Sequence, residues 1–182
     1  MKNLSILCLA ILSLGVLSCK EKINDREPEV VTVDTTADKA VPYEVAKIDA
    51  EFNDPKVEAI FKQYLKLESA LVNTDATATS NEAAQLKPLF AEKEVDAAAQ
   101  TAIAAMADSE DIKLQREHFE AVSAEMEKML QGALKSGTVY KQFCPMAFNN
   151  RGASWISSSR DILNPYFGDK MLKCGRVEAE IR

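Results

Sequence analysis

Residues 53–72, NDPKVEAIFKQYLKLESALV, decide the fold class of this chain. Asp54 is placed to cap a helix, and Pro55 suits the first turn, where its missing N–H costs nothing. Behind them, apolar side chains recur every three or four positions: Val57, Ile60, Phe61, Tyr64, Leu65, Leu71 and Val72. This spacing puts them on one face and predicts an amphipathic helix of about five turns.

The next two segments continue the helical pattern. Residues 80–107 begin with a cap at Ser80 or Asn81 and are rich in alanine, and we expect Pro88 to start, kink or divide that helix. Residues 109–137 form the third segment, with Gly137 as its C-terminal stop. Its apolar face is made of Ile112, Phe119, Val122, Met126, Met129 and Leu130.

The C-terminal part differs in kind from these helices. Residues 138–144 read as a strand, residues 152–175 are loop-rich, and residues 176–181 alternate apolar and charged side chains as a half-buried strand does. The two strands are expected to pair as a small ribbon. The sequence therefore predicts a mainly α fold, a three- to four-helix antiparallel bundle with a short two-stranded C-terminal β element.

The N-terminus has the layout of a secretory signal peptide over residues 1–18. Lys2 is followed by an apolar run from Leu4 to Leu17 that is shorter than the roughly 20 residues a membrane span needs. Residues 16–19, Val-Leu-Ser-Cys, match the lipobox of bacterial lipoproteins, so Cys19 is expected to be acylated and become the first residue. The alternative is that Cys19 merely sits near an ordinary cleavage site.

Acylation would anchor the protein to a membrane, because several acyl chains on one residue suffice for stable attachment. Residues 19–50 are charged and hold two prolines, which predicts a flexible tether, and residues 51–182 are expected to form one domain. Lys20-Glu21-Lys22 resembles signals that send some lipoproteins to the cell surface. The predicted location is the envelope of a Gram-negative bacterium, on the outer membrane, with the periplasmic or surface face left open.

Charge and motifs exclude several function classes. The chain has 22 basic and 28 acidic side chains, a net charge of −6, and no basic stripe for phosphate groups, so a nucleic-acid partner is not expected. It contains no GxSxG, no HExxH and no glycine-rich phosphate loop. The sequence therefore predicts a protein that is not an enzyme.

Four sulfur-bearing residues are concentrated near the C-terminus: Cys144, Met146, Met171 and Cys174. Cys144 and Met146 share a side of an extended segment, and Met171 and Cys174 share a side of a bend. Thiolates and thioethers prefer Cu(I) to hard cations, so the pattern fits a Cu(I) site. The alternative is that the methionines fill the core and the cysteines form a disulfide, which the exported compartment favours.

His118 is the only histidine and lies beside the apolar Phe119, at the margin of the expected core face. A histidine in this position is more often a hydrogen-bonded structural residue than a ligand. It is retained as a further candidate metal ligand, although about 16 Å of helix separates it from Met129.

Three blocks of the C-terminal part resemble the signature of an uncharacterised family of bacterial extracytoplasmic domains. They are Tyr140-Lys-Gln-Phe-Cys-Pro-Met-Ala-Phe148, Ala153-Ser-Trp-Ile-Ser157 and Asn164-Pro-Tyr-Phe-Gly-Asp-Lys-Met-Leu-Lys-Cys-Gly175. The resemblance extends over roughly residues 53–180. Members occur alone or fused to the periplasmic adaptor subunits of heavy-metal efflux pumps, which implies a role in copper or other heavy-metal handling with an efflux system as partner.

Two hypotheses follow from these observations. The first is a membrane-tethered protein that sequesters Cu(I) or delivers it to heavy-metal efflux through the four sulfur residues. The second is an interaction module of the envelope in which Cys144 and Cys174 are a structural disulfide and Trp155, Tyr166 and Phe167 form a structured loop.

Overall fold

The computed structural model describes residues 41–182, so the signal segment and Cys19 lie outside the described residues. About half of the described residues are helical, which agrees with the predicted mainly α class. The elements follow in the order β1 (Ala50–Phe52), α1 (Pro55–Val72), α2 (Ala76–Ala91), α3 (Ala97–Ala107), α4 (Ile112–Leu130), β2 (Leu134–Gly137), β3 (Val139–Cys144), α5 (Ala147–Asn150), β4 (Ala153–Ser157), η1 (Gly168–Lys170) and β5 (Arg176–Ile181).

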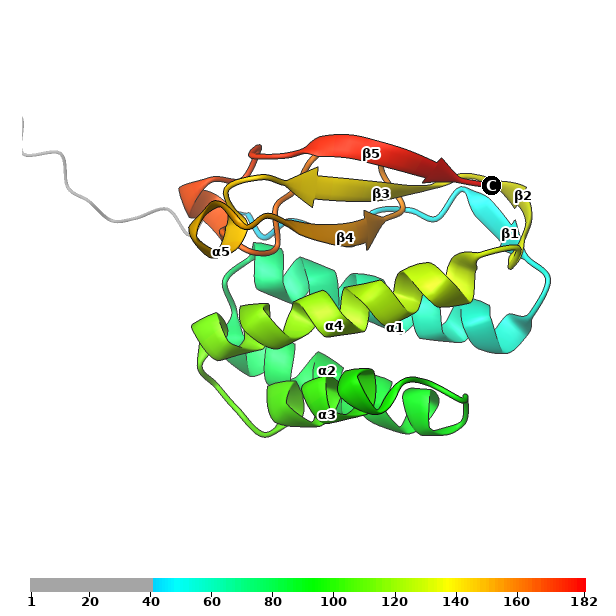
Figure 1. Ribbon diagram of the computed structural model, residues 1–182, viewed down its shortest axis with the longest axis horizontal. Helices are drawn as coiled ribbons and strands as arrows, with labels where there is room; N and C mark the ends of the chain where they lie inside the picture. Colours follow the sequence, from blue (N-terminus) through cyan, green and yellow to red (C-terminus); the bar gives the residue numbers. More distant parts are fainter. Residues whose placement is uncertain (1–40) are drawn as a thin grey trace, which may run out of the picture. The chain divides into compact units, whose positions relative to one another are not determined.

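The described part is arranged in layers (Figure 1). The sheet of β3, β4 and β5 lies over α1 and α4, and α2 and α3 lie on the other side of these two helices. α1 packs against α2 and α4, and α3 also packs against α2 and α4. One continuous apolar core joins the helices to the sheet. That the long helices form an antiparallel bundle stays a prediction.

The start of α1 confirms the sequence prediction. The Asp54 carboxylate accepts a hydrogen bond from the backbone N–H of Lys56 at 2.8 Å, and Pro55 is the first helical residue. Every apolar residue of the predicted α1 stripe is buried, and Phe61, Tyr64 and Leu71 have no exposed surface. Burial of this stripe against α2, α4 and the sheet is what stabilises the helix.

The bounds of the other helices differ from the predicted ones. α2 begins five residues earlier than expected because Asp75 caps it, accepting a hydrogen bond from Ala78 N–H at 2.8 Å. Pro88 neither starts nor divides α2; it lies three residues before the helix end. α4 ends at Leu130, whereas Gly137 belongs to β2.

The backbone conformation at position 137 requires a glycine. Its φ is +87°, and a Cβ atom there would lie 2.2 Å from the carbonyl oxygen of Asp49. The glycine therefore permits the close pairing of β1 with β2, and this two-stranded antiparallel sheet was not expected from the sequence.

The expected ribbon of residues 138–144 and 176–181 is present as the antiparallel pair β3–β5. β3 also pairs with β4 on its other side, so the sheet has three strands in the order β4-β3-β5. The outer edge of β4 is occupied by two side chains: Ile156 N–H donates to the Tyr64 hydroxyl at 3.1 Å, and the Tyr166 hydroxyl donates to the Ser154 carbonyl at 2.5 Å. These hydroxyls take the place of a fourth strand.

Candidate functional site

Cys144 and Cys174 come together at one end of the three-stranded sheet. Cys144 is the last residue of β3, and Cys174 precedes β5 by two residues, so the pairing of the two strands brings the cysteines to the same place. Their sulfur atoms lie 3.0 Å apart, and both are free thiols. Cys144 is fully buried and Cys174 half-buried. We call these two residues the cysteine pair.

The surroundings of Cys174 disfavour its thiolate form. The hydrogen bond with Cys144, together with partial burial, raises the pKa of the Cys174 thiol, although the backbone N–H of Met146 donates to the same sulfur and opposes the shift. At neutral pH the Cys174 thiol is therefore protonated, and a metal ion that binds there must displace its proton.

Asn164 holds the segment that carries Cys174. This fully buried side chain donates through Nδ2 to the carbonyl of Cys174 at 2.6 Å. Its Oδ1 accepts from the backbone N–H of Tyr166 at 2.8 Å and of Phe167 at 3.2 Å. The Asn-Pro-Tyr-Phe-Gly block is thus a turn that is closed by its first residue and fastened to the cysteine.

Arg116 of α4 fastens the same turn to the helices. Its Nε donates to the Pro165 carbonyl at 2.8 Å, and its Nη2 donates to the Leu71 carbonyl and the Thr74 hydroxyl, each at 3.0 Å. A Cβ atom at Gly168, whose φ is +57°, would lie 2.2 Å from the Thr74 hydroxyl oxygen. The glycine therefore allows this close approach.

Met146 and Met171 line an open depression beside the cysteine pair. We call it the methionine depression; its wall includes Phe148, Phe167, Lys113 and Arg116, and its volume is about 930 Å³. Met146 is 46% exposed, an unusual degree for so apolar a side chain, while Met171 is half-buried. Of the four predicted sulfur ligands, the two cysteines are therefore in contact with each other, and the two methionines lie together in the wall of the adjacent depression.

The backbone that follows Met146 is strained. Phe148, Asn149 and Asn150 have φ values of +51°, +59° and +67° and form a left-handed turn. Asparagine adopts this conformation at low cost, whereas phenylalanine does not. Phe148 is held there by an edge-on contact with Tyr166, at 5.3 Å between ring centroids, and by the Arg151 guanidinium 5.0 Å from its ring centre. Such strain is typical of segments whose shape matters for function.

His118 lies elsewhere. It is half-buried on α4 and is not part of the wall of the methionine depression. Across residues 41–182, no group of three or more His, Cys, Asp or Glu side chains is placed to hold a metal ion. A metal at the cysteine pair would therefore take its remaining ligands from thioethers or from a partner.

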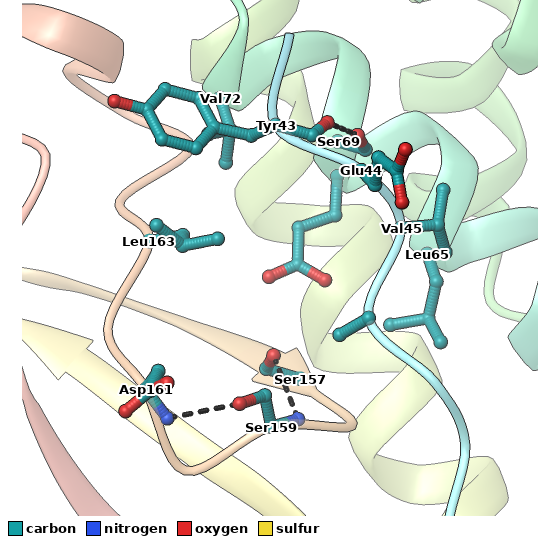
Figure 2. A pocket seen from close by; sticks show the side chains of 12 residues that line it. Tyr43, Glu44, Val45, Leu65, Ser69, Val72, Ser157, Ser159, Asp161 and Leu163 are labelled. Carbon is teal, nitrogen blue, oxygen red and sulfur yellow. Dashed lines mark hydrogen bonds between the residues drawn. The ribbon is translucent and has the colours of Figure 1, made fainter. Parts of the chain in front are cut away.

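A second, much smaller cavity lies between α1, the end of β4 and the segment of residues 43–46 (Figure 2). Its volume is about 20 Å³, room for about one water molecule. The segment crosses the helix on one side, and Ser157, Ser159 and Asp161 face the cavity from the other. Residues 43–46 fall within the predicted tether, yet they are bonded to the domain.

Four hydrogen bonds fasten that segment, and the first runs from the Tyr43 N–H to Asn73 Oδ1 at 2.8 Å. Ser69 Oγ and Asn73 Nδ2 donate to the Tyr43 carbonyl at 2.8 and 2.9 Å, and Ser158 Oγ donates to the Ala46 carbonyl at 3.1 Å. The cavity wall includes the buried carboxyl of Glu68, whose pKa burial raises well above its ordinary range. The volume of this cavity is too small for an organic ligand.

The sequence alone did not reveal the positioning roles of Asn164 and Arg116. An Asn-Pro pair is a turn signal and pointed toward the first, but nothing in the pattern around residue 116 indicates that its side chain reaches residue 165. Trp155, expected in a loop, is fully buried in β4 and meets Tyr166 edge-on at 6.0 Å. Tyr166 is buried and Phe167 is half-buried. The three aromatic residues that were expected to form a structured loop in the interaction module therefore pack beside the candidate site.

None of the helices in residues 41–182 is long and apolar enough to cross a bilayer.

Residues 60–137 match a family model described as a protein of unknown function (DUF3347). The match runs from α1 to the end of β2 and supports the predicted relation to an uncharacterised domain family. It covers less than half of the chain and ends before Cys144, so it includes neither the cysteine pair nor Met146 and Met171. Of the wall of the methionine depression it includes only the part on α4, which contains Lys113 and Arg116. The bacterial origin and the fusion to efflux adaptors stay predictions. No curated protein and no solved structure matches the chain.

Proposed function

We propose that this protein is a membrane-tethered extracytoplasmic lipoprotein, without enzymatic activity, that binds Cu(I) and sequesters it or passes it to a heavy-metal efflux system. The observation that carries the proposal is the cysteine pair, two free thiols 3.0 Å apart, beside the wall that holds Met146 and Met171. The tether and its lipid follow from the signal segment and from Cys19.

The chemistry of these groups suits a soft monovalent ion. Two thiolates bind Cu(I) as soft donors and give the site a net charge of about −1, and one or two thioethers complete a low coordination number without adding charge. Binding releases the proton of the Cys174 thiol, so the apparent affinity rises with pH over the range in which this thiol is protonated. His118 does not lie in the wall that holds the methionines and enters the proposal only as a variant to be tested.

A competition titration tests the proposal. The reduced mature protein should take up about one equivalent of Cu(I) from a coloured chelator, since the residues make one site. Cys144→Ser and Cys174→Ser should each abolish this uptake. Met146→Leu and Met171→Leu keep the side-chain volume and remove the soft donor, so they should weaken uptake with little effect on stability.

The matched control is Met129→Leu, which changes a half-buried thioether on α4. It should leave the uptake unchanged. His118→Ala should also leave the uptake unchanged. A loss of Cu(I) uptake larger than the accompanying loss of folded protein would identify His118 as a ligand. A reduced and folded protein that leaves the chelator's copper untouched would contradict the proposal.

The same short contact favours one other function, an envelope interaction module stabilised by a Cys144–Cys174 disulfide. A shift of about 1 Å would bring the sulfurs to bonding distance. In that case the exported protein would contain no free thiol, and replacing either cysteine would cost about 2–5 kcal/mol of the oxidised protein's stability. Neither methionine variant would then affect metal uptake, and thiol counting on freshly exported protein separates the two proposals.

A further inference from the structure

We infer that the methionine depression is the docking surface for an acidic, thioether-bearing segment of the protein with which Cu(I) is exchanged. The inference rests on the proposed function, because it assigns a partner to the same site. Size, charge and surface chemistry of the depression each support it.

The depression is far larger than a metal ion requires. At about 930 Å³ it lies at the upper end of the range for sites that enclose organic ligands, whereas a metal ion needs only its ligand shell. The space outside the sulfur atoms is therefore available to a segment of another molecule. Because Met146 is 46% exposed on this wall, such a segment can reach one soft donor without any change in the fold.

The wall carries an excess of positive charge in a chain whose net charge is −6. Lys113, Arg116, Arg151 and Lys170 line the depression against a single acidic residue, Glu117. Arg151 is paired with Glu120 at 2.6 Å, but no carboxylate of residues 41–182 forms a salt bridge with the other three cations. The charges of the exposed Lys113 and Lys170 are therefore available to an anionic partner, whereas Arg116 is half-buried and already bonded to the Pro165 and Leu71 carbonyls and the Thr74 hydroxyl.

The floor between these cations is apolar and soft. Phe148, Phe167 and Ile112 are half-buried beside the two methionines. An acidic segment that also bears methionine matches this combination, because its carboxylates meet the cations while its thioethers meet the sulfur wall. An anionic bilayer fits less well, since a hollow offers no projecting apolar side chains for insertion into a flat lipid surface.

The test uses the full mature protein and a synthetic twelve-residue peptide of alternating acidic residues and methionine, loaded with Cu(I). A second peptide, with lysine in place of each acid, is the chemical control. The variant is the double substitution Lys113→Glu with Lys170→Glu, two exposed side chains at the rim. The matched control is Lys66→Glu with Lys87→Glu, exposed lysines on α1 and α2.

At low salt, reversal of the rim charges should slow copper transfer from the acidic peptide by at least about tenfold, and added salt should shrink the difference. Equilibrium uptake from a small neutral chelator should stay unchanged, and so should transfer to the control variant. The lysine peptide should transfer copper slowly to the native protein and faster to the rim variant.

Equal transfer rates in all three proteins would overturn the inference. So would a rim variant that transfers normally but loses binding to vesicles of anionic lipid, because the cations would then serve a membrane. Binding of the metal-free, fluorescently labelled acidic peptide is measured separately by anisotropy. If copper uptake fails but this binding depends on the rim charges, the metal proposal is wrong and the docking surface stands.

Discussion

At the scale of single residues, Glu68 is a carboxyl group that is buried without a basic partner. It is 6% exposed in a wall that also contains the carboxyls of Glu44 and Asp161 but no basic side chain. Burial raises its pKa well above the ordinary value, and a hydrogen bond with Ser157 offsets only part of that shift. The folded protein thus keeps this carboxyl neutral at a pH where the unfolded chain would ionise it.

The sign of the resulting pH dependence is determined. Below the pKa of the unfolded state, near 4.5, the carboxyl is protonated in both states and costs nothing. As pH rises above that value, the unfolded state is favoured by its ionisation, so the stability of the folded state falls until the raised pKa is reached. Glu68 therefore weakens the fold at neutral pH.

Glu68→Gln should stabilise the protein at pH 7–8 and have little effect near pH 4. The amide occupies the same volume and does not ionise, so the loss of stability with rising pH is removed. A gain of 1 kcal/mol would raise the melting temperature by about 2–8 °C. Melting curves from pH 4 to 8 check this, with the exposed Glu94→Gln, between α2 and α3, as control. A gain that is the same at all pH values would show that ionisation is not the cause.

At the scale of elements, the segment between β4 and β5 contains only the one-turn helix η1, and side chains bonded to its backbone contribute much of its order. Asn164 makes the central contribution, because it joins the start of the turn at Tyr166 to the carbonyl of Cys174. The position of one sulfur of the cysteine pair therefore depends on an uncharged amide ten residues away.

Asn164→Ala should destabilise the protein by at least about 2 kcal/mol, because it leaves two backbone N–H groups and one carbonyl without their partner in a buried place. Urea denaturation measures this loss. Asn81→Ala, on the exposed face of α2, should change stability little. The Cu(I) affinity of the Asn164 variant should also fall; a variant with full stability would mean that water replaces the amide.

These elements also show what a sequence can reveal. α1 was predictable because its cap, its proline and its apolar stripe all lie within one short segment. β4 was missed because Ala-Ser-Trp-Ile-Ser is buried on both faces and rich in serine, so no alternation marks it. The pairing of β3 with β5 made the meeting of the cysteines foreseeable. The bonds of Arg116 and Asn164 were not, because contacts across 49 and 10 residues leave no periodic trace.

At the scale of the whole molecule, a chain of aromatic rings runs through the core from Phe52 of β1, which meets Phe61 at 5.7 Å between centroids, to the wall of the methionine depression. Phe61 stacks on Tyr64 at 6.3 Å between centroids, Tyr64 on Phe119 at 5.3 Å, and Phe119 meets Tyr166 at 5.9 Å. Tyr166 in turn contacts Phe148. The helical layers and the cysteine pair are thus parts of one packed interior.

Phe119→Ala should cost about 3–5 kcal/mol, a large share of the stability of a domain of this size, and lower the melting temperature sharply. The variant removes a fully buried ring that touches aromatic residues on both sides. Leu114→Ala, which changes a 36% exposed side chain on the same helix, should have a small effect. A melting curve of Phe119→Ala that matches that of the native protein would refute this account of the core.

The two tyrosine hydroxyls at the outer edge of β4 have a consequence for assembly. An edge strand with free backbone groups is a template on which another chain can add a strand, and this is a common start of aggregation. Here the hydroxyls of Tyr64 and Tyr166 are already bonded to the Ile156 N–H and the Ser154 carbonyl, two backbone groups with which an added strand would pair. Of the three strands in this sheet, β5 keeps an open edge, and its exposed Arg176, Glu178 and Glu180 discourage pairing there. Intermolecular growth of the sheet is therefore blocked by hydrogen bonding on one side and opposed by charge on the other.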